Sequence, residues 1–352
     1  MEGLSQGPAG PAGAPGYSRI EQFPLGLFAS VMGIGGLAFV WRGAAVLFGF
    51  DARWAHLPFA LSVLAFVAIL AAVVVKAIRF PRRMRQEWGD PVKLNFFAAG
   101  TISLMLLGTY LVPLSHGIAL ALWATGTALH LVLTLTALRR WIDTEAVPMQ
   151  GLNPTWFMPV VGNLLVPVGG AELGFVELSW FHFSIGAFFW PLLLGLILNR
   201  LFFHERLAPA AQPSLFIMIS PPAVGYLAYV ELTGAPDAFA WFLFYVTVFM
   251  LMLLLLMLPR LMRNPFTESW WSFSFPTAAA CVCLVEYAAL TAGAVARAVA
   301  AAGTVLTTLL IAFLVLRTAG AIWRGTIFLR PDPAARASPG GQEAAVADPR
   351  VG

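Results

Sequence analysis

The stretch 239–262 reads FAWFLFYVTVFMLMLLLLMLPRLM, and Arg260 is its only charged residue. A water-soluble helix of this length needs a polar face, whereas about 20 consecutive apolar residues cross the hydrocarbon core of a bilayer. Comparable runs recur along the whole chain of 352 residues, of which 59% are hydrophobic and only 11% charged. This composition excludes disordered, nucleic-acid-binding and ordinary globular proteins. The sequence therefore predicts an all-α polytopic membrane protein.

The length of the apolar runs predicts ten transmembrane helices. Short turns such as 113–117 and 232–236 follow the odd-numbered spans, so we expect consecutive spans to pair as five helical hairpins. The predicted spans are 24–48, 56–78, 94–112, 117–138, 155–168, 177–203, 213–230, 239–262, 269–290 and 294–328.

The distribution of positive charge predicts the orientation. Of the 21 Lys and Arg residues, only Arg42, Arg53 and Arg297 fall on the side of the turns that follow odd-numbered spans. Because basic residues in short loops stay in the cytoplasm, both termini should be cytoplasmic in a bacterial-type inner (plasma) membrane. The basic clusters are interpreted as anchors beside anionic lipid, so no nucleic-acid partner is expected.

The two ends of the chain are rich in Gly, Pro and Ala. Residues 1–16 lack a basic segment followed by an apolar core, which argues against a cleaved signal peptide. We expect a mobile cytoplasmic tail at 1–22, a transmembrane channel domain at 23–328 and a disordered cytoplasmic tail at 329–352.

Odd- and even-numbered spans differ in composition. The odd-numbered spans contain internal Gly and Pro, such as Gly108, Pro167 and Gly225, whereas the even-numbered spans are long and rich in Leu, Ala and Val. Proline removes a helical hydrogen bond, and the freed backbone groups are tolerated at bilayer depth only inside protein or beside a wet cavity. This pattern favours kinked odd helices inside and straight even helices outside. The alternative is that Gly and Pro merely permit close helix packing.

Three segments resemble the tellurite-resistance/dicarboxylate-transporter family, which includes bacterial tellurite-resistance proteins and the plant slow anion channels. They are FPLGLFASVMG at 23–33, followed by Trp41, NPTWFMPVVGN at 153–163, and WWSFSFPT at 270–277. The resemblance implies a pseudo-fivefold ring of five hairpins, usually a homotrimer, with a separate pore in each subunit. It also implies that a phenylalanine of the ninth span plugs the pore. Its position beside Pro276 identifies that residue as Phe275, with Phe273 as the alternative.

The expected pore is uncharged at its centre. No odd-numbered span places Lys or Arg near its middle, so a passing anion would be held only by helix ends and unpaired amides. Large, weakly hydrated anions should then pass most easily. Residues at the cytoplasmic mouth, namely Lys93, Arg140 and Arg263, should raise the local anion concentration. The residues expected to line the pore are Phe28, Gly33, Gly36, Phe97, Gly100, Pro159, Asn163, Pro222 and Pro276.

Polar residues within the spans leave alternatives. Glu286 either faces an external vestibule or pairs with Arg297, and the ion pair is favoured because an acidic lining would repel anions. His130 and His182 are interpreted as hydrogen-bonded packing or subunit contacts rather than as proton sensors. Asn163 could equally donate to the pore or cap the kink at Pro159. The side chain at Arg42 should extend to the membrane interface.

The leading hypothesis is a gated anion channel that conducts small monovalent anions such as chloride or nitrate without a cofactor. The alternative is a proton-coupled or facilitative carrier of C4-dicarboxylate, sulfite or tellurite, although no odd-numbered span has a carboxylate midway along it. No GxSxG or HExxH motif and no Cys/His cluster is present, so we expect neither an enzyme nor a metal site. Inorganic or small organic anions and membrane lipid are the expected partners.

Overall fold

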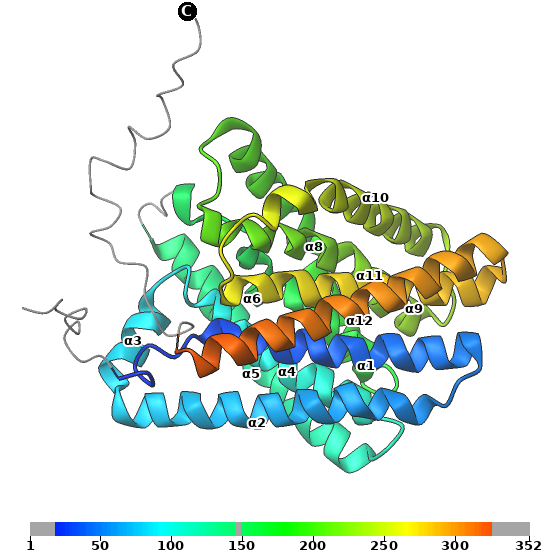
Figure 1. Cartoon of the computed structure of the whole chain (residues 1–352), viewed down its shortest axis with the longest axis horizontal. Coiled ribbons are helices and arrows are strands. Elements are labelled where there is room, and N and C mark those ends of the chain that lie inside the picture. Colours follow the sequence, from blue (N-terminus) through cyan, green and yellow to red (C-terminus); the bar gives the residue numbers. More distant parts are fainter. Residues whose placement is uncertain (1–17, 145–148, 326–352) are drawn as a thin grey trace, which may run out of the picture.

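The structure is a computed structural model that describes residues 18–144 and 149–325, and every regular element in those ranges is helical. Eight of the described helical segments are long and apolar enough to cross a membrane. Figure 1 shows long helices running side by side along the longest axis of the molecule. The α-helices are α1 (Phe28–Phe48), α2 (His56–Arg79), α3 (Pro81–Gly89), α4 (Asn95–Leu111), α5 (His116–Asp143), α6 (Phe157–Val161), α7 (Val166–Gly170), α8 (Val176–Phe203), α9 (Ser220–Thr233), α10 (Ala238–Leu261), α11 (Ser274–Thr291) and α12 (Ala294–Trp323).

Most predicted spans correspond to one long helix, and two spans and one loop differ from expectation. The third span is the shorter apolar helix α4. The fifth span is not a continuous α-helix, because the 3-10 turn Pro154–Trp156 precedes α6 and a second 3-10 turn, Gly162–Leu165, separates α6 from α7. The basic segment after the second span, expected as a loop, forms the short helix α3.

Several prolines of the odd-numbered spans lie in the first turn of an α-helix that follows a 3-10 segment. The seventh span begins as the 3-10 segment Pro209–Ile219, and the ninth begins as Glu268–Phe273. Pro221, Pro222 and Pro276 then lie in the first turn of α9 and α11, where a missing N–H costs little. Proline is not confined to odd-numbered spans either, since α8 continues through Pro191.

Burial separates the long odd-numbered spans from the even-numbered ones. In Leu25–Phe48, Pro209–Thr233 and Glu268–Thr291, 61% of the most apolar window is buried. The corresponding share is 22% to 39% in α2, α5, α8, α10 and α12. The even-numbered spans therefore present large apolar side chains outward, as a surface that contacts lipid requires.

Several glycines allow two helices to approach closely. A methyl group on Gly33 would overlap the side chain of Ser274, and one on Gly108 would lie 2.7 Å from the backbone nitrogen of Trp123. Gly33 thus allows α1 to pack closely against α11, and Gly108 allows α4 to pack closely against α5. For these two residues, close packing is the reason for glycine.

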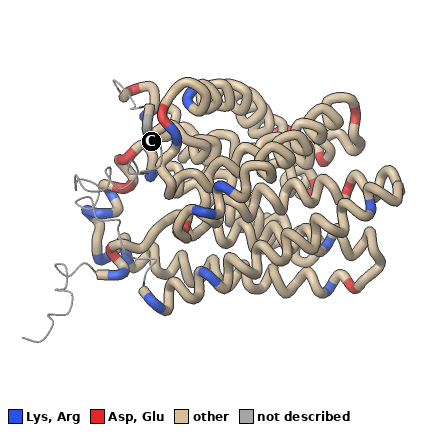
Figure 2. Tube along the Cα trace, turned by 45° about the horizontal axis from the view of Figure 1, so that its top comes forward, with Lys and Arg blue, Asp and Glu red and all other residues tan. Residues whose placement is uncertain are grey.

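Positive charge is concentrated at one end of the bundle, where α2, α5, α8, α10 and α12 end; we call it the basic end and the opposite one the turn end. Figure 2 shows Lys and Arg gathered toward this end, with a largely uncharged middle. A buried ion pair lies near the basic end: Lys76 Nζ is 2.6 Å from Glu87 Oε2 and also donates to the Phe23 carbonyl. Most of the two expected tails falls outside the described residues.

Candidate functional site

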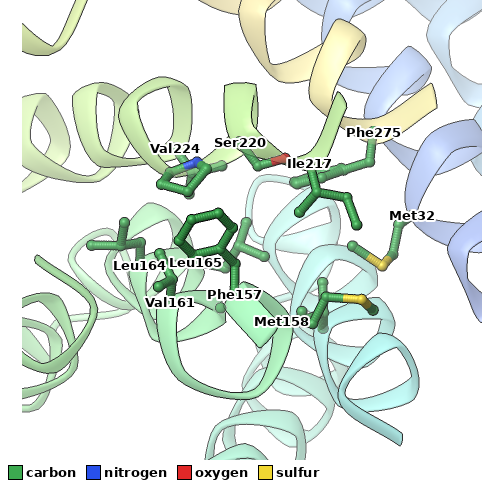
Figure 3. Close-up of a pocket in the computed structure, with 13 residues that line it drawn as sticks. Met32, Phe157, Met158, Val161, Leu164, Leu165, Ile217, Ser220, Val224 and Phe275 are labelled. Carbon is green, nitrogen blue, oxygen red and sulfur yellow. The ribbon is translucent and has the colours of Figure 1, made fainter. Parts of the chain in front are cut away.

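A small, apolar cavity of about 50 Å³ lies among the odd-numbered spans. Figure 3 shows its side chains meeting from separate elements, among them Met32 of α1, Phe157 of α6 and Phe275 of α11. The hydroxyl of Ser220, at the start of α9, is its only polar side chain. Such a lining offers an ion very little substitute for its hydration shell.

A larger cavity of about 190 Å³, here called the vestibule, extends from Phe275 toward the turn end. Its lining also comes from the odd-numbered spans, for example Gly36 of α1, Leu106 of α4 and Val168 of α7. Unlike the small cavity, it contains charged side chains. These are Arg42, Glu172, Glu231 and Glu286.

Three residues line both cavities: Leu165, Val224 and Phe275. They come from three different spans and are apolar and buried. The two cavities are therefore neighbours that meet at a constriction formed by these three side chains. Of the three, only Phe275 was expected from the sequence.

Arg42 is held in a fixed place beside the vestibule. Its Nη2 donates to the Tyr110 carbonyl at 2.7 Å, and its guanidinium carbon lies 3.6 Å from the centroid of the Tyr110 ring. Tyr110 is in turn buried, stacks on Phe59 at 4.1 Å and has its hydroxyl 3.0 Å from His56 Nδ1. Arg42 therefore lies on the cavity wall, and its expected extension to the membrane interface stays a prediction.

The vestibule glutamates come from three segments. Glu172 follows α7, Glu231 lies near the end of α9, and Glu286 lies on α11. Glu286 forms no ion pair in the described part of the chain, and Arg297 instead donates to the Leu47 carbonyl at 2.9 Å. The ion pair favoured from the sequence is therefore wrong, and the vestibule position is the one observed.

Among the residues expected to line the pore, Phe275 and Gly36 border these cavities. A methyl group on Gly100 would lie 3.5 Å from the Phe28 ring, which itself packs against Phe66 at 5.7 Å. Phe97 lies edge-on to Trp88 at 5.0 Å. The expected pore residues that line neither cavity are Phe28, Gly33, Phe97, Gly100, Pro159, Asn163, Pro222 and Pro276.

Asn163 is fully buried and belongs to a hydrogen-bond network around the broken fifth span. Its Nδ2 donates to Thr134 Oγ1 at 2.9 Å and to the Val160 carbonyl at 2.7 Å. Thr134 Oγ1 donates to the Pro159 carbonyl, and His182 Nδ1 donates to Asn163 Oδ1 at 2.6 Å. The amide therefore holds the break in place, which is the second of its two expected roles.

The two buried histidines pack as expected. His130 Nδ1 lies 2.7 Å from Thr101 Oγ1, and its ring fills the space beside Gly162, while His182 contacts Asn163. Both have hydrogen-bond partners within the same chain. These contacts join α5 and α8 to the odd-numbered spans.

The three basic residues expected at the cytoplasmic mouth lie near the basic end. Lys93 Nζ is 3.9 Å from Asp90, the Arg140 guanidinium lies 5.4 Å from the Trp88 ring, and Arg263 is exposed. None of them lines either cavity. Their effect on local anion concentration stays a prediction.

Sequence reasoning missed Leu165 and Val224 at the constriction and Arg42 in the vestibule. Nothing in the residue type separates this Leu or Val from the many others in the chain. A signal did exist for Arg42, because it lies six residues before the end of α1 rather than at its end. A charge inside an apolar helix is costly unless it faces protein or a wet cavity.

The family model described as "Voltage-dependent anion channel" matches residues 22–319. The chain is similar to the S-type anion channel SLAH3 of Arabidopsis thaliana, with 25% identity over 76% of this chain and 43% of the plant protein. It is also similar to the Uncharacterized transporter MJ0762 of Methanocaldococcus jannaschii, with 24% identity over 74% of this chain and 83% of that protein. A Tellurite resistance protein TehA homolog of Haemophilus influenzae is 23% identical over 87% of this chain and 93% of its own length. The chain spans about half the length of the first two plant relatives.

Proposed function

Because this chain belongs to the voltage-dependent anion channel family, we propose that it is a gated channel for small monovalent anions such as chloride and nitrate. The small cavity, the constriction and the vestibule are consecutive parts of the proposed pathway. Phe275 is the proposed gate.

The observation that carries this proposal is the position of Phe275 between two cavities. Its ring borders both, together with Leu165 and Val224. A benzyl side chain can rotate about two torsions, and an apolar constriction blocks ions both sterically and by excluding water. Rotation of one ring would therefore join the two spaces.

Weak, non-specific attraction suits conduction of an anion. The small cavity has no charged side chain that would hold an ion tightly, and tight binding would prevent release.

The proposed assembly follows the family resemblance. The five hairpins would form a ring with the odd-numbered spans inside, and three such subunits would each contain a pore. Burial of the odd-numbered spans and their contributions to both cavities support this arrangement. The basic end is the proposed cytoplasmic end, where Lys93, Arg140 and Arg263 would attract anions.

The test is Phe275→Ala in purified protein reconstituted into planar bilayers. Removing the ring should open the constriction, so we expect at least a tenfold increase in chloride and nitrate current. Phe273→Ala is the matched control. Phe273 is buried against Phe216 and Trp270 and lines neither cavity, so its replacement should lower stability without raising the current.

A folded Phe275→Ala protein with wild-type current would contradict the gate. So would an equal increase in both variants, because that would indicate general loosening of the bundle.

A second candidate function is a proton-coupled or facilitative carrier of C4-dicarboxylate, sulfite or tellurite. One observation favours it: the carboxylates of Glu172, Glu231 and Glu286 face one cavity, where a proton could be exchanged with substrate. Anion flux that saturates and follows an imposed pH gradient, without single-channel steps, would support the carrier over the channel.

A further inference from the structure

We propose that Arg42 is an anion-binding residue of the vestibule, and that Glu172, Glu231 and Glu286 keep its occupancy low until they take up protons. The ligand class is a small monovalent anion with oxygen or halide acceptors. This inference deepens the proposed function, since it assigns a binding site on the pathway beyond the gate.

Arg42 uses only part of its hydrogen-bonding capacity within the protein. A guanidinium has five N–H donors in a rigid fork. One nitrogen, Nη2, donates to the Tyr110 carbonyl, and one face of the guanidinium packs on the Tyr110 ring. Nε and Nη1 have no hydrogen-bond partner among the residues that the structure describes. Donors are therefore available on a side chain that lines the vestibule.

The glutamates of the vestibule do not neutralise Arg42 by pairing with it. All three line the same cavity, yet none forms an ion pair with it in the described part of the chain. A guanidinium surrounded by carboxylates ordinarily pairs with one of them. Here the carbonyl of Tyr110 and the aromatic ring hold it on α1, away from that pairing.

The position of Arg42 suits an ion that is about to cross the constriction. Gly36 contacts Phe275, and Arg42 lies six residues farther along α1, which is about 9 Å at 1.5 Å per residue. Glu286 lies eleven residues beyond Phe275 on α11, or about 16 Å. An anion at Arg42 would therefore lie between the gate and the glutamate Glu286.

The charge balance of the vestibule gives the direction of the pH effect. With all carboxylates ionised, three negative side chains accompany one positive side chain, and the field opposes an anion. Each proton taken up removes one negative charge and leaves Arg42 unchanged, because arginine stays protonated. Occupancy by an anion should therefore increase as the pH on the vestibule side falls.

Other titratable groups near the vestibule are accounted for by contacts. His56 contacts Tyr110, Tyr229 donates to Asp237, and Arg297 donates to the Leu47 carbonyl. Further titratable side chains on elements packed around the vestibule include Tyr226 on α9, Cys281, Cys283 and Tyr287 on α11, Arg53 and Asp51 before α2, and Glu177 and His182 on α8. None of these lines the vestibule.

Direct binding is measured with nitrate, on the full chain in detergent at pH 5. Thermal unfolding is recorded in sodium nitrate and in sodium gluconate, because a ligand that binds the folded state raises the unfolding temperature. In Arg42→Gln, nitrate should no longer raise the unfolding temperature, because its affinity for nitrate should be reduced at least tenfold. The control is Arg297→Gln, which also removes a guanidinium bonded to a backbone carbonyl at the turn end but lies outside the vestibule.

Arg42→Lys provides a second variant if Arg42→Gln does not fold. It retains the charge but not the planar fork that binds nitrate through two parallel hydrogen bonds. We expect nitrate to raise the unfolding temperature of Arg42→Lys by little more than chloride does. Equal shifts in wild type, Arg42→Gln and Arg297→Gln, or a nitrate shift in Arg42→Lys as large as in wild type, would overturn the site.

The role of the glutamates is measured as current in the Phe275→Ala background. A fall from pH 8 to pH 5 on the vestibule side should increase nitrate current at least threefold. The triple replacement of Glu172, Glu231 and Glu286 by Gln should give the high current at both pH values, whereas Glu177→Gln should behave as its parent. A triple variant with the parent's pH response would overturn the role of the glutamates.

If Phe275→Ala passes no anion while Arg42→Gln loses nitrate binding, the channel proposal fails and the Arg42 site stands.

Discussion

Gly36 of α1 lies directly against Phe275 of α11. A methyl group on Gly36 would be 3.6 Å from Cδ2 of the Phe275 ring and 2.8 Å from Cβ of Ala278. The proposed gate therefore packs against a backbone without a side chain, and the distance between α1 and α11 depends on that glycine. Gly36 thus lines the vestibule and is also a point of close contact between the two helices.

Gly36→Ala should destabilise the protein and restrict the gate. Alanine raises helix propensity by about 1 kcal/mol, but overpacking costs about 1–3 kcal/mol, and Ala278 Cβ cannot rotate away. We expect a lower unfolding temperature in detergent and reduced anion current. Gly195→Ala is the control, because its methyl group would meet no atom within 4 Å. A Gly36→Ala protein as stable as Gly195→Ala would show that α1 and α11 separate easily.

Asn163→Ala should reduce stability while leaving the order of anion permeability unchanged. The substitution removes the partner of the buried His182 Nδ1–H and the donor to Thr134, and one buried unsatisfied group costs about 1–3 kcal/mol. Thermal unfolding and reversal potentials in mixed chloride and nitrate would measure the two effects. A changed permeability ratio would show that Asn163 lines the pore.

Glu87→Ala should be strongly destabilising, by about 3–5 kcal/mol, because it leaves the ammonium of Lys76 buried without its partner. Adding Lys76→Met should restore much of that loss. The exposed pair Arg139–Asp143 provides the comparison, since its removal should cost about 0–1 kcal/mol. A Lys76→Met/Glu87→Ala protein no more stable than Glu87→Ala would contradict the pairing.

Asp237 should make α10 sensitive to acid. Its carboxylate accepts the backbone N–H of Ala240 and of Phe239 and the hydroxyl of Tyr229, and these bonds lower the pKa of Asp237, the Ala240 bond most. A lowered folded-state pKa gives stability above the usual value of 3.8 that is lost as the pH falls through the folded-state pKa. Asp237→Ala should therefore unfold at a lower temperature than wild type at pH 7, with a smaller difference at pH 3. A difference that is equal at both pH values would exclude the charged cap.

Much of the fold could be predicted from hydropathy alone. An apolar run as long as that in α10 is stable as a helix that crosses a bilayer. The long apolar runs of α2, α5, α8 and α12 are likewise long helices. The family was also predictable, because three motifs in the right order agree with a match over residues 22–319. The shape of the fifth span was not predictable, since its apolar content does not reveal that a 3-10 turn separates α6 from α7.

The candidate site was predictable only in part. Phe275 and Gly36 were expected, but the remaining proposed pore residues were chosen because Gly and Pro mark irregular backbone. In the structure several of these serve packing, as Gly33 does against Ser274. Glu286 was assigned to an ion pair because sequence distance gives no information about which charges share a cavity.

The sequence by itself determined that this protein is a helical membrane protein of the anion channel family, because apolar length and motif order are properties of the chain read in one dimension. Tertiary structure alone decided which side chains meet at Phe275 and which charges face the vestibule. The reason is rotational: a helix in a bilayer is apolar on every side, so its pattern does not say which face turns inward. Packing against neighbouring helices sets that face, and with it the position of Arg42 and the three glutamates.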